Sequence, residues 1–213
     1  MAHVLIVEDS ADTVEVLTKV IQLKFPDWTT DSAASVPEAR RKLADPRQPY
    51  DFAILDFKLP DEHGEVKGDF SVCQQIRQQA PSTRVIHITA YADDPKITLH
   101  VRDVHLEDFD TGCSISKDKT DWMDQVVAKL HSFRIEAKFN ALFEPLQASR
   151  HELREVPKGG SVTNRLLDLC ADTRLHWKFL APAVQQRIRS VLSVDDSEPD
   201  NVRVSLIGEV RSK

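Results

Sequence analysis

VLIVEDS, residues 4–10, decides the fold of this chain, because a buried-strand pattern of four apolar residues runs directly into an acidic pair, Glu8 and Asp9. Three later apolar runs also end in a polar residue. These residues are Asp56 after the run 52–55, Thr89 after the run 85–88, and Lys117 after a short run around Ile115. Polar residues at the carboxyl ends of buried parallel strands are where an open α/β sheet builds its site.

Helix-periodic stretches separate these runs. They cover about 12–23, 36–44, 69–79, 95–104 and the segment from 121 onward, and a weaker strand is expected over 28–33. Ser35 is a predicted helix N-cap, with Glu38 three residues later. Alternation of strands and helices at this spacing predicts a doubly wound parallel sheet with right-handed crossovers.

The acidic residues at the strand ends predict a cation site. Carboxylates of Glu8, Asp9 and Asp56 that meet at one edge of a sheet repel one another unless a cation lies between them. Hard oxygen ligands of this kind suit Mg²⁺, which keeps some of its water and accepts a phosphoryl oxygen. A neighbouring lysine and threonine, Lys117 and Thr89, are suited to hold that phosphoryl group by charge and hydrogen bond.

The ordered set of motifs resembles the receiver domain of bacterial two-component response regulators over about residues 1–130. The pieces that carry the resemblance are VLIVEDS (4–10), FAILDFKLPDEHG (52–64), VIHITAY (85–91) and SISKD (114–118). The resemblance implies a flavodoxin-like (βα)5 fold with sheet order 2-1-3-4-5. It also implies a non-enzymatic phosphorelay protein in the cytoplasm, with a sensor histidine kinase or a phosphotransfer protein as its partner.

The same resemblance implies a role for each strand-end residue. Asp56 is the expected phospho-acceptor. The expected Mg²⁺ ligands are the side chains of Glu8, Asp9 and Asp56 and the backbone carbonyl of Lys58. Thr89 and Ala90 are expected to bind the phosphoryl group and act in the switch, and Lys117 is expected to ion-pair with the acceptor or its phosphate.

The sequence departs from the family pattern around the lysine. Asp118 stands where the family usually has proline, and Lys119 is an alternative to Lys117 as the family's lysine, although that choice places Lys117 at an inward strand position. Ser114 occupies the usual position of an aromatic switch residue, for which Tyr91 or Phe109 are candidate substitutes.

The chain departs from the family pattern a second time after Pro60, where the segment before the next helix is longer than usual. The segment 61–69, which contains EHGEVKGD, looks like an insertion of about four residues beside the acceptor. Its position predicts that it screens the acceptor or meets a partner.

Charge and composition limit the partners. Residues 1–130 hold 15 Lys+Arg and 23 Asp+Glu, whereas residues 131–213 hold 13 and 11, so a strongly basic nucleic-acid-binding region is not expected. No apolar run approaches the ~20 residues that cross a bilayer, and the start lacks signal-peptide features. Three widely separated cysteines predict no disulfide framework, in keeping with the cytoplasm.

Residues 131–213 are expected to form a small, mostly helical output or interaction region, with a linker at about 147–160. The stretch 120–146 predicts a final receiver helix and then a second short helix; the alternative is one long helix from 121 on that pairs with a partner chain in a homodimer. Further helices are expected over 162–178 and 182–193, with an extended segment from Val202 to Leu206.

Two output functions are considered for this region. An interaction or dimerisation module is favoured. A helix-turn-helix DNA-binding function is the alternative, with Gln185, Gln186, Arg187 and Arg189 as the groove-facing residues. For the whole protein, the alternative to a phosphorylated regulator is an unphosphorylated receiver-fold interaction scaffold. His151 resembles a sensor-kinase phospho-accepting histidine, which we attribute to chance.

Overall fold

The computed structural model describes residues 2–45, 49–61, 63, 66–68, 70–91, 114–148, 160–180, 182–198 and 201–206. The chain divides into two compact units, Met1–Val127 and Ala128–Lys213, which are described separately here. The helix predicted over 95–104, together with Phe109, His151 and nearly all of the predicted linker, lies outside the described residues.

A five-stranded parallel sheet forms the centre of the first unit. Its strands are β1 (His3–Val7), β2 (Thr29–Ala33), β3 (Phe52–Asp56), β6 (Arg84–Thr89) and β7 (Ser114–Ser116). Their order is β2-β1-β3-β6-β7, and every neighbouring pair is parallel. This confirms the predicted doubly wound sheet with order 2-1-3-4-5.

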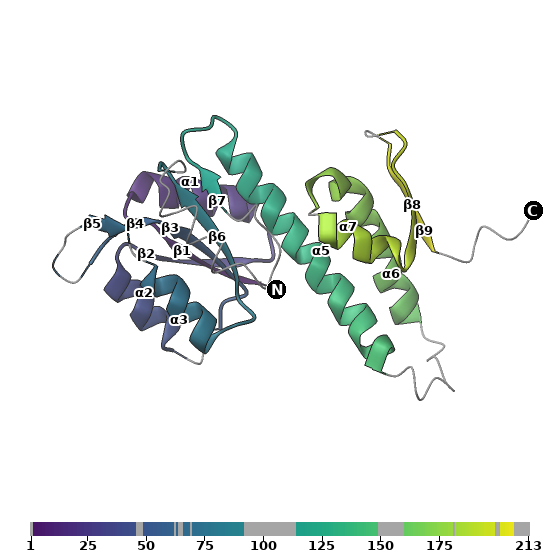
Figure 1. The fold of residues 1–213 in the computed structure, drawn as a ribbon, viewed down its shortest axis with the longest axis horizontal. Helices are drawn as coiled ribbons and strands as arrows, with labels where there is room; N and C mark the ends of the chain where they lie inside the picture. The colour runs from purple at the N-terminus through teal and green to yellow at the C-terminus, as the bar shows by residue number, and fades with distance from the viewer. Residues whose placement is uncertain are drawn as a thin grey trace, which may run out of the picture. The chain divides into compact units, whose positions relative to one another are not determined.

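Helices α1 (Ala11–Lys24), α2 (Val36–Leu43) and α3 (Ser71–Gln79) cover the sheet, with α2 and α3 on one side and α1 on the other (Figure 1). The predicted cap is present: the Ser35 hydroxyl accepts from the backbone N–H of Glu38 at 3.4 Å. The Glu38 carboxylate in turn accepts from the Ala34 N–H at 2.9 Å. Two backbone donors at the start of α2 are thereby satisfied, as in a capping box.

Strand register brings the predicted site residues to one edge of the sheet. Val7 lies beside Leu55, and Asp56 lies beside Ile88, so β1, β3 and β6 end close to one another. These strands are buried nearly throughout, which explains why they read as continuous apolar runs in the sequence.

The segment after Asp56 forms a hairpin that the sequence did not predict. Strands β4 (Lys58–Pro60) and β5 (Val66–Gly68) pair antiparallel, with Lys58 opposite Gly68. The predicted insertion therefore supplies β5 and folds back on the chain that directly follows the acceptor position.

One long helix, α5 (Trp122–Ala148), replaces the two helices predicted over 120–146, so that prediction was wrong. Asn140 lies within this helix, and its side-chain oxygen accepts from Arg187 Nη2 at 2.6 Å. Ile135 and Phe139 are buried in the core of the second unit. These apolar side chains of α5 are therefore packed within their own chain.

The second unit is completed by α6 (Gly160–His176), a 3₁₀ turn (Trp177–Phe179), α7 (Pro182–Arg189), and strands β8 (Leu192–Asp195) and β9 (Arg203–Leu206). The helix predicted over 182–193 ends at Arg189, because Leu192 pairs with Leu206 in an antiparallel hairpin. Leu192 and Val202 join the core beside Trp177, and the Trp177 indole N–H donates to Asp196 at 3.0 Å. The unit is mostly helical, as predicted, with a hairpin that was not.

Within the described part of the chain, every helix falls short of the length and apolar character that a membrane crossing needs.

A matched pair of substitutions on α6 tests the core of the second unit. Leu169 is fully buried, so Leu169→Ala leaves a cavity and is expected to cost about 2–5 kcal/mol of unfolding free energy. Leu175 is 64% exposed, so Leu175→Ala is expected to change it by no more than about 0.5 kcal/mol. Hydrogen exchange of peptides from 160–206, at low protein concentration, measures both. Equal effects would contradict this core.

Candidate functional site

The charged residues of the candidate site lie at the ends of three strands, and a fourth strand, β6, anchors one of these ends. Glu8 and Asp9 follow β1 directly, Asp56 is the last residue of β3, and Lys117 follows β7. The backbone N–H of Lys117 donates to the Thr89 carbonyl at 2.8 Å, which ties the end of β7 to the end of β6. The Glu8 N–H donates to the Ala33 carbonyl at 3.0 Å and likewise anchors the end of β1. These backbone hydrogen bonds thus fix the Cα positions of Lys117 and Glu8 at the edge of the sheet.

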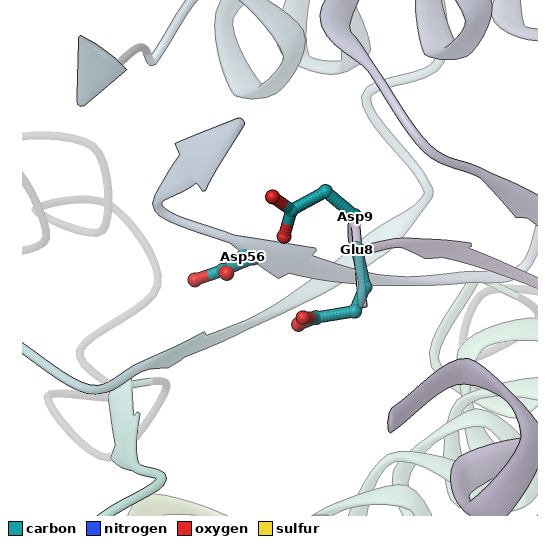
Figure 2. Close-up of side chains that lie close together, drawn as sticks. All are labelled: Glu8, Asp9 and Asp56. Atoms are coloured by element: carbon teal, nitrogen blue, oxygen red, sulfur yellow. The ribbon is translucent and has the colours of Figure 1, made fainter. Parts of the chain in front are cut away.

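The three predicted carboxylates come together. Glu8, Asp9 and Asp56 each offer an oxygen, and these oxygens all lie within 4.8 Å of one another. Figure 2 shows the side chains converging from the ends of the neighbouring strands β1 and β3. Glu8 and Asp56 are buried, at 2% and 7% exposure, whereas Asp9 is exposed. The cluster therefore consists of one exposed carboxylate and two buried ones.

Lys117 lies against the two buried acids. Its Nζ is 2.8 Å from Asp56 Oδ2 and 3.0 Å from Glu8 Oε2. Lys119 is exposed and lies in the turn after β7, so the structure places the amine of Lys117 in the cluster and not that of Lys119. Because β7 ends at Ser116, Lys117 is not an inward strand residue.

Burial and like charge set the electrostatics of the cluster. Burial raises the pKa of the Glu8 carboxyl, and the charge of Asp56 raises it further, against the hydrogen bond from Lys117. Burial lowers the pKa of Lys117, but its hydrogen bonds and ion pairs with Asp56 and Glu8 outweigh this and leave the pKa raised. Lys117 therefore stays charged at neutral pH.

Asp56 is held by both oxygens. Oδ1 accepts from the backbone N–H of Phe57 at 2.7 Å, and Oδ2 accepts from Lys117. The Phe57 contact was missed by sequence reasoning, and a backbone donor carries no residue-type signal by which it could be found. These two contacts fix the carboxylate plane at the end of β3.

Thr89 is fully buried, and its Oγ1 accepts from the backbone N–H of Tyr91 at 2.9 Å. Ala90, between them, is exposed. Lys58 contributes a side-chain contact that was not predicted, since its Nζ lies 3.3 Å from the centroid of the Tyr91 ring. Tyr91 itself is 48% exposed, so the ring that was proposed to replace the missing aromatic switch residue stands over Lys58 at the surface.

The candidate DNA-reading residues of α7 mostly contact their own unit. Gln185 donates to the Trp177 carbonyl at 2.8 Å, Arg187 ion-pairs with Glu136 of α5 at 3.3 Å, and Arg189 ion-pairs with Asp196. Of the four, Gln186 is exposed, and its side chain makes no hydrogen bond or ion pair among the described residues. Both arginines are thus neutralised within the unit.

The response regulator receiver domain model matches residues 4–110 of the chain. The response regulator protein PilR of Pseudomonas aeruginosa is 41% identical over 87 residues, which cover 41% of this chain and 18% of that protein. The chain thus spans less than a fifth of the length of this curated relative.

Solved structures of receiver domains are among the proteins that the chain matches. The signal receiver domain of a putative LuxO repressor protein from Vibrio parahaemolyticus matches with a TM-score of 0.51 and 20% identity, covering 67% of this chain and 97% of that one. A CheY-like response regulator receiver domain protein from Methanospirillum hungatei matches with a TM-score of 0.46 and 21% identity, covering 64% and 98%. With the family model matching half of its residues and the sheet in the expected order, the chain belongs to the response regulator receiver domain family of two-component systems.

Proposed function

We propose that this protein is a phosphorelay response regulator that accepts a phosphoryl group on Asp56 in the presence of Mg²⁺. One observation carries the proposal: three carboxylates cluster at the strand ends, and among the described residues one ammonium, that of Lys117, pairs with two of them, Glu8 and Asp56. With all the groups ionised, the cluster keeps a charge of about −2 in a partly buried place, which favours a bound cation. The proposed donors are a sensor histidine kinase or a phosphotransfer protein, acting in the cytoplasm.

The donor set suits Mg²⁺ because all of its members are hard oxygen ligands. Glu8, Asp9, Asp56 and the backbone carbonyl of Lys58 are the proposed ligands. When bound, Mg²⁺ supplies positive charge that neutralises the phosphoryl oxygens. Asp9 is exposed on the solvent side of the cluster, and the buried Glu8 lies behind it, paired with Lys117.

The residues of the chain have separate tasks in the transfer. A carboxylate oxygen of Asp56 forms the new bond to phosphorus, and the bond between phosphorus and the donor breaks as the leaving group departs with its electron pair. Lys117 offsets the charge on the acceptor and then on its acyl phosphate. Among the described residues, the Thr89 hydroxyl accepts from Tyr91 and donates to no other group, so its proton is proposed to bond a phosphoryl oxygen beside the Ala90 backbone.

The output is proposed to run through the second unit. The acyl phosphate on Asp56 draws Thr89 toward it and shifts the segment that follows Thr89. This change favours a different set of surface contacts. Contact with protein is favoured over DNA, because Arg187 and Arg189 are both engaged in ion pairs within their unit. We class the protein as a signalling protein rather than an enzyme.

Phosphoryl transfer is tested with acetyl phosphate and Mg²⁺. The wild-type chain is expected to gain the mass of one phosphoryl group, because Asp56 is held by two donors in a cation site. Asp56→Asn is expected to gain none, whereas Asp12→Asn, an exposed residue in the first turn of α1, is expected to behave as wild type. Intact-protein mass spectrometry measures all three. An unmodified wild-type chain would favour the scaffold function, and labelling of Asp56→Asn would place the acceptor elsewhere.

Metal binding is tested at Asp9. Loss of a second-shell contact alone weakens metal sites about 10–100-fold, so loss of a charged ligand in Asp9→Asn is expected to weaken Mg²⁺ binding by at least about 10-fold. Isothermal titration calorimetry measures the affinity, with Asp12→Asn as the matched control. Unchanged affinity in Asp9→Asn would exclude Asp9 as a ligand.

The role of the lysine is tested by Lys117→Met, with the exposed Lys119→Met as control. Without Mg²⁺, removing the ammonium leaves two buried carboxylates facing each other and is expected to cost about 1–3 kcal/mol of unfolding free energy. Added Mg²⁺ is expected to stabilise Lys117→Met more than the wild type, because the cluster has become more negative. Urea unfolding with and without Mg²⁺ measures this. A Mg²⁺ effect equal in all three chains would contradict the shared cluster.

A further inference from the structure

A pair of aromatic rings closes the open end of the β4–β5 hairpin, directly beside the acceptor position. Phe57 comes immediately before β4, and Phe70 comes two residues after β5. Their ring centroids lie 4.8 Å apart at an interplanar angle of 42°, which is a favourable arrangement for two aromatic rings. Lys58 pairs with Gly68 at the same end of the hairpin, so the ring contact continues the pairing of the two strands.

The Phe57 ring packs apart from the main core of the first unit. Phe57 is 6% exposed, and among the described residues it forms a small cluster with Phe70. That cluster is separate from the core cluster that contains Leu55 and Val72. Within the described part of the chain, Phe70 is therefore the apolar side chain that determines where the Phe57 ring lies.

Phe70 is itself anchored by helix α3. Its carbonyl accepts from the backbone N–H of Gln74 at 2.9 Å, so Phe70 takes part in the first turn of the helix. Val72 and Ile76 of the same helix are buried in the main core. A residue at the start of a helix that is packed in this way has little freedom to move, and its ring gives Phe57 a fixed support.

The backbone of Phe57 in turn holds the acceptor. Its N–H donates to Asp56 Oδ1 at 2.7 Å, while Lys117 holds Oδ2. The direction of this N–H depends on the orientation of the peptide between Asp56 and Phe57, which the packing of the Phe57 ring restricts. We propose that Phe70 is a positioning residue for phosphoryl transfer, which acts through Phe57 to keep the Asp56 carboxylate in its reactive orientation. This inference rests on the proposed phosphorylation of Asp56.

The rate of phosphoryl transfer from acetyl phosphate in the presence of Mg²⁺ tests this role. Phe70→Ala is expected to lower the rate about 10-fold or more, because a misplacement of about 1 Å at the reacting atoms can cost about 100-fold. Phe70→Leu keeps a large apolar side chain at this position and is expected to restore most of the rate. Intact-protein mass spectrometry over a time course measures the rates.

Val72→Ala is the matched control. It removes buried apolar volume from the same helix but in the other cluster, so it is expected to lower the unfolding free energy and to keep the wild-type rate of transfer. Urea unfolding of Phe70→Ala and Val72→Ala measures their stabilities. The control therefore separates an effect on the acceptor from a loss of stability.

Two further measurements ask whether Phe70 acts through Phe57. The Phe57 amide resonance in NMR reports its hydrogen bond to Asp56, so it is expected to shift in Phe70→Ala and to keep its place in Val72→Ala. Phe57→Ala keeps the backbone N–H but removes the ring. Its combination with Phe70→Ala is expected to be no slower than the slower of the two single variants, because changes at two ends of one contact are not additive.

The outcomes separate this inference from the function on which it rests. A wild-type rate in Phe70→Ala would overturn the inference and leave the proposed phosphorylation intact. Equal losses of rate in Phe70→Ala and Val72→Ala would overturn it as well, since the effect would then be one of stability. A wild-type chain that gains no phosphoryl group would remove the proposed function, and this inference with it.

Discussion

The rest of the first unit depends on the repulsion among the carboxylates of Glu8, Asp9 and Asp56 and on its partial relief by Lys117. Burial makes that repulsion stronger, because the charges lose the screening of water. Removing them would leave an ordinary apolar sheet edge. Keeping them costs stability, which parallel strands buried on both faces can supply. The sheet thus serves as a rigid support for a cluster whose repulsion Lys117 relieves only in part.

Much of this cluster was predictable from the sequence, because its residues lie at the ends of strands that are visible as runs of apolar residues. A run of apolar residues such as 52–55 indicates a buried strand. The residue at its end then lies at the edge of the sheet where parallel strands form a site. The order of the strands required the family resemblance, since periodicity does not say which strands are neighbours. The choice between Lys117 and Lys119 depended on where β7 ends, a boundary that local pattern fixes only to within a few residues.

The wrong predictions share a cause in tertiary contacts. The stretch 120–146 was predicted as two helices, yet Asn140 lies inside one helix and accepts a hydrogen bond from Arg187 of α7. Leu192 continues the helical period of α7, but its pairing with Leu206 draws it into a strand. The β4–β5 hairpin could not be predicted either. A three-residue strand is identified by the strand it pairs with, because its own sequence is too short to show a pattern.

Charge is used in opposite ways in the two units. In the first, like charges are crowded around the ends of the strands. In the second, opposite charges are paired: Lys138 with Asp172 at 2.7 Å, and Arg187 with Glu136. Phosphate contacts dominate nucleic-acid binding, and a basic side chain that is paired within its own unit is less available for them. These ion pairs are the reason we favour a protein over a nucleic acid as the partner of this region.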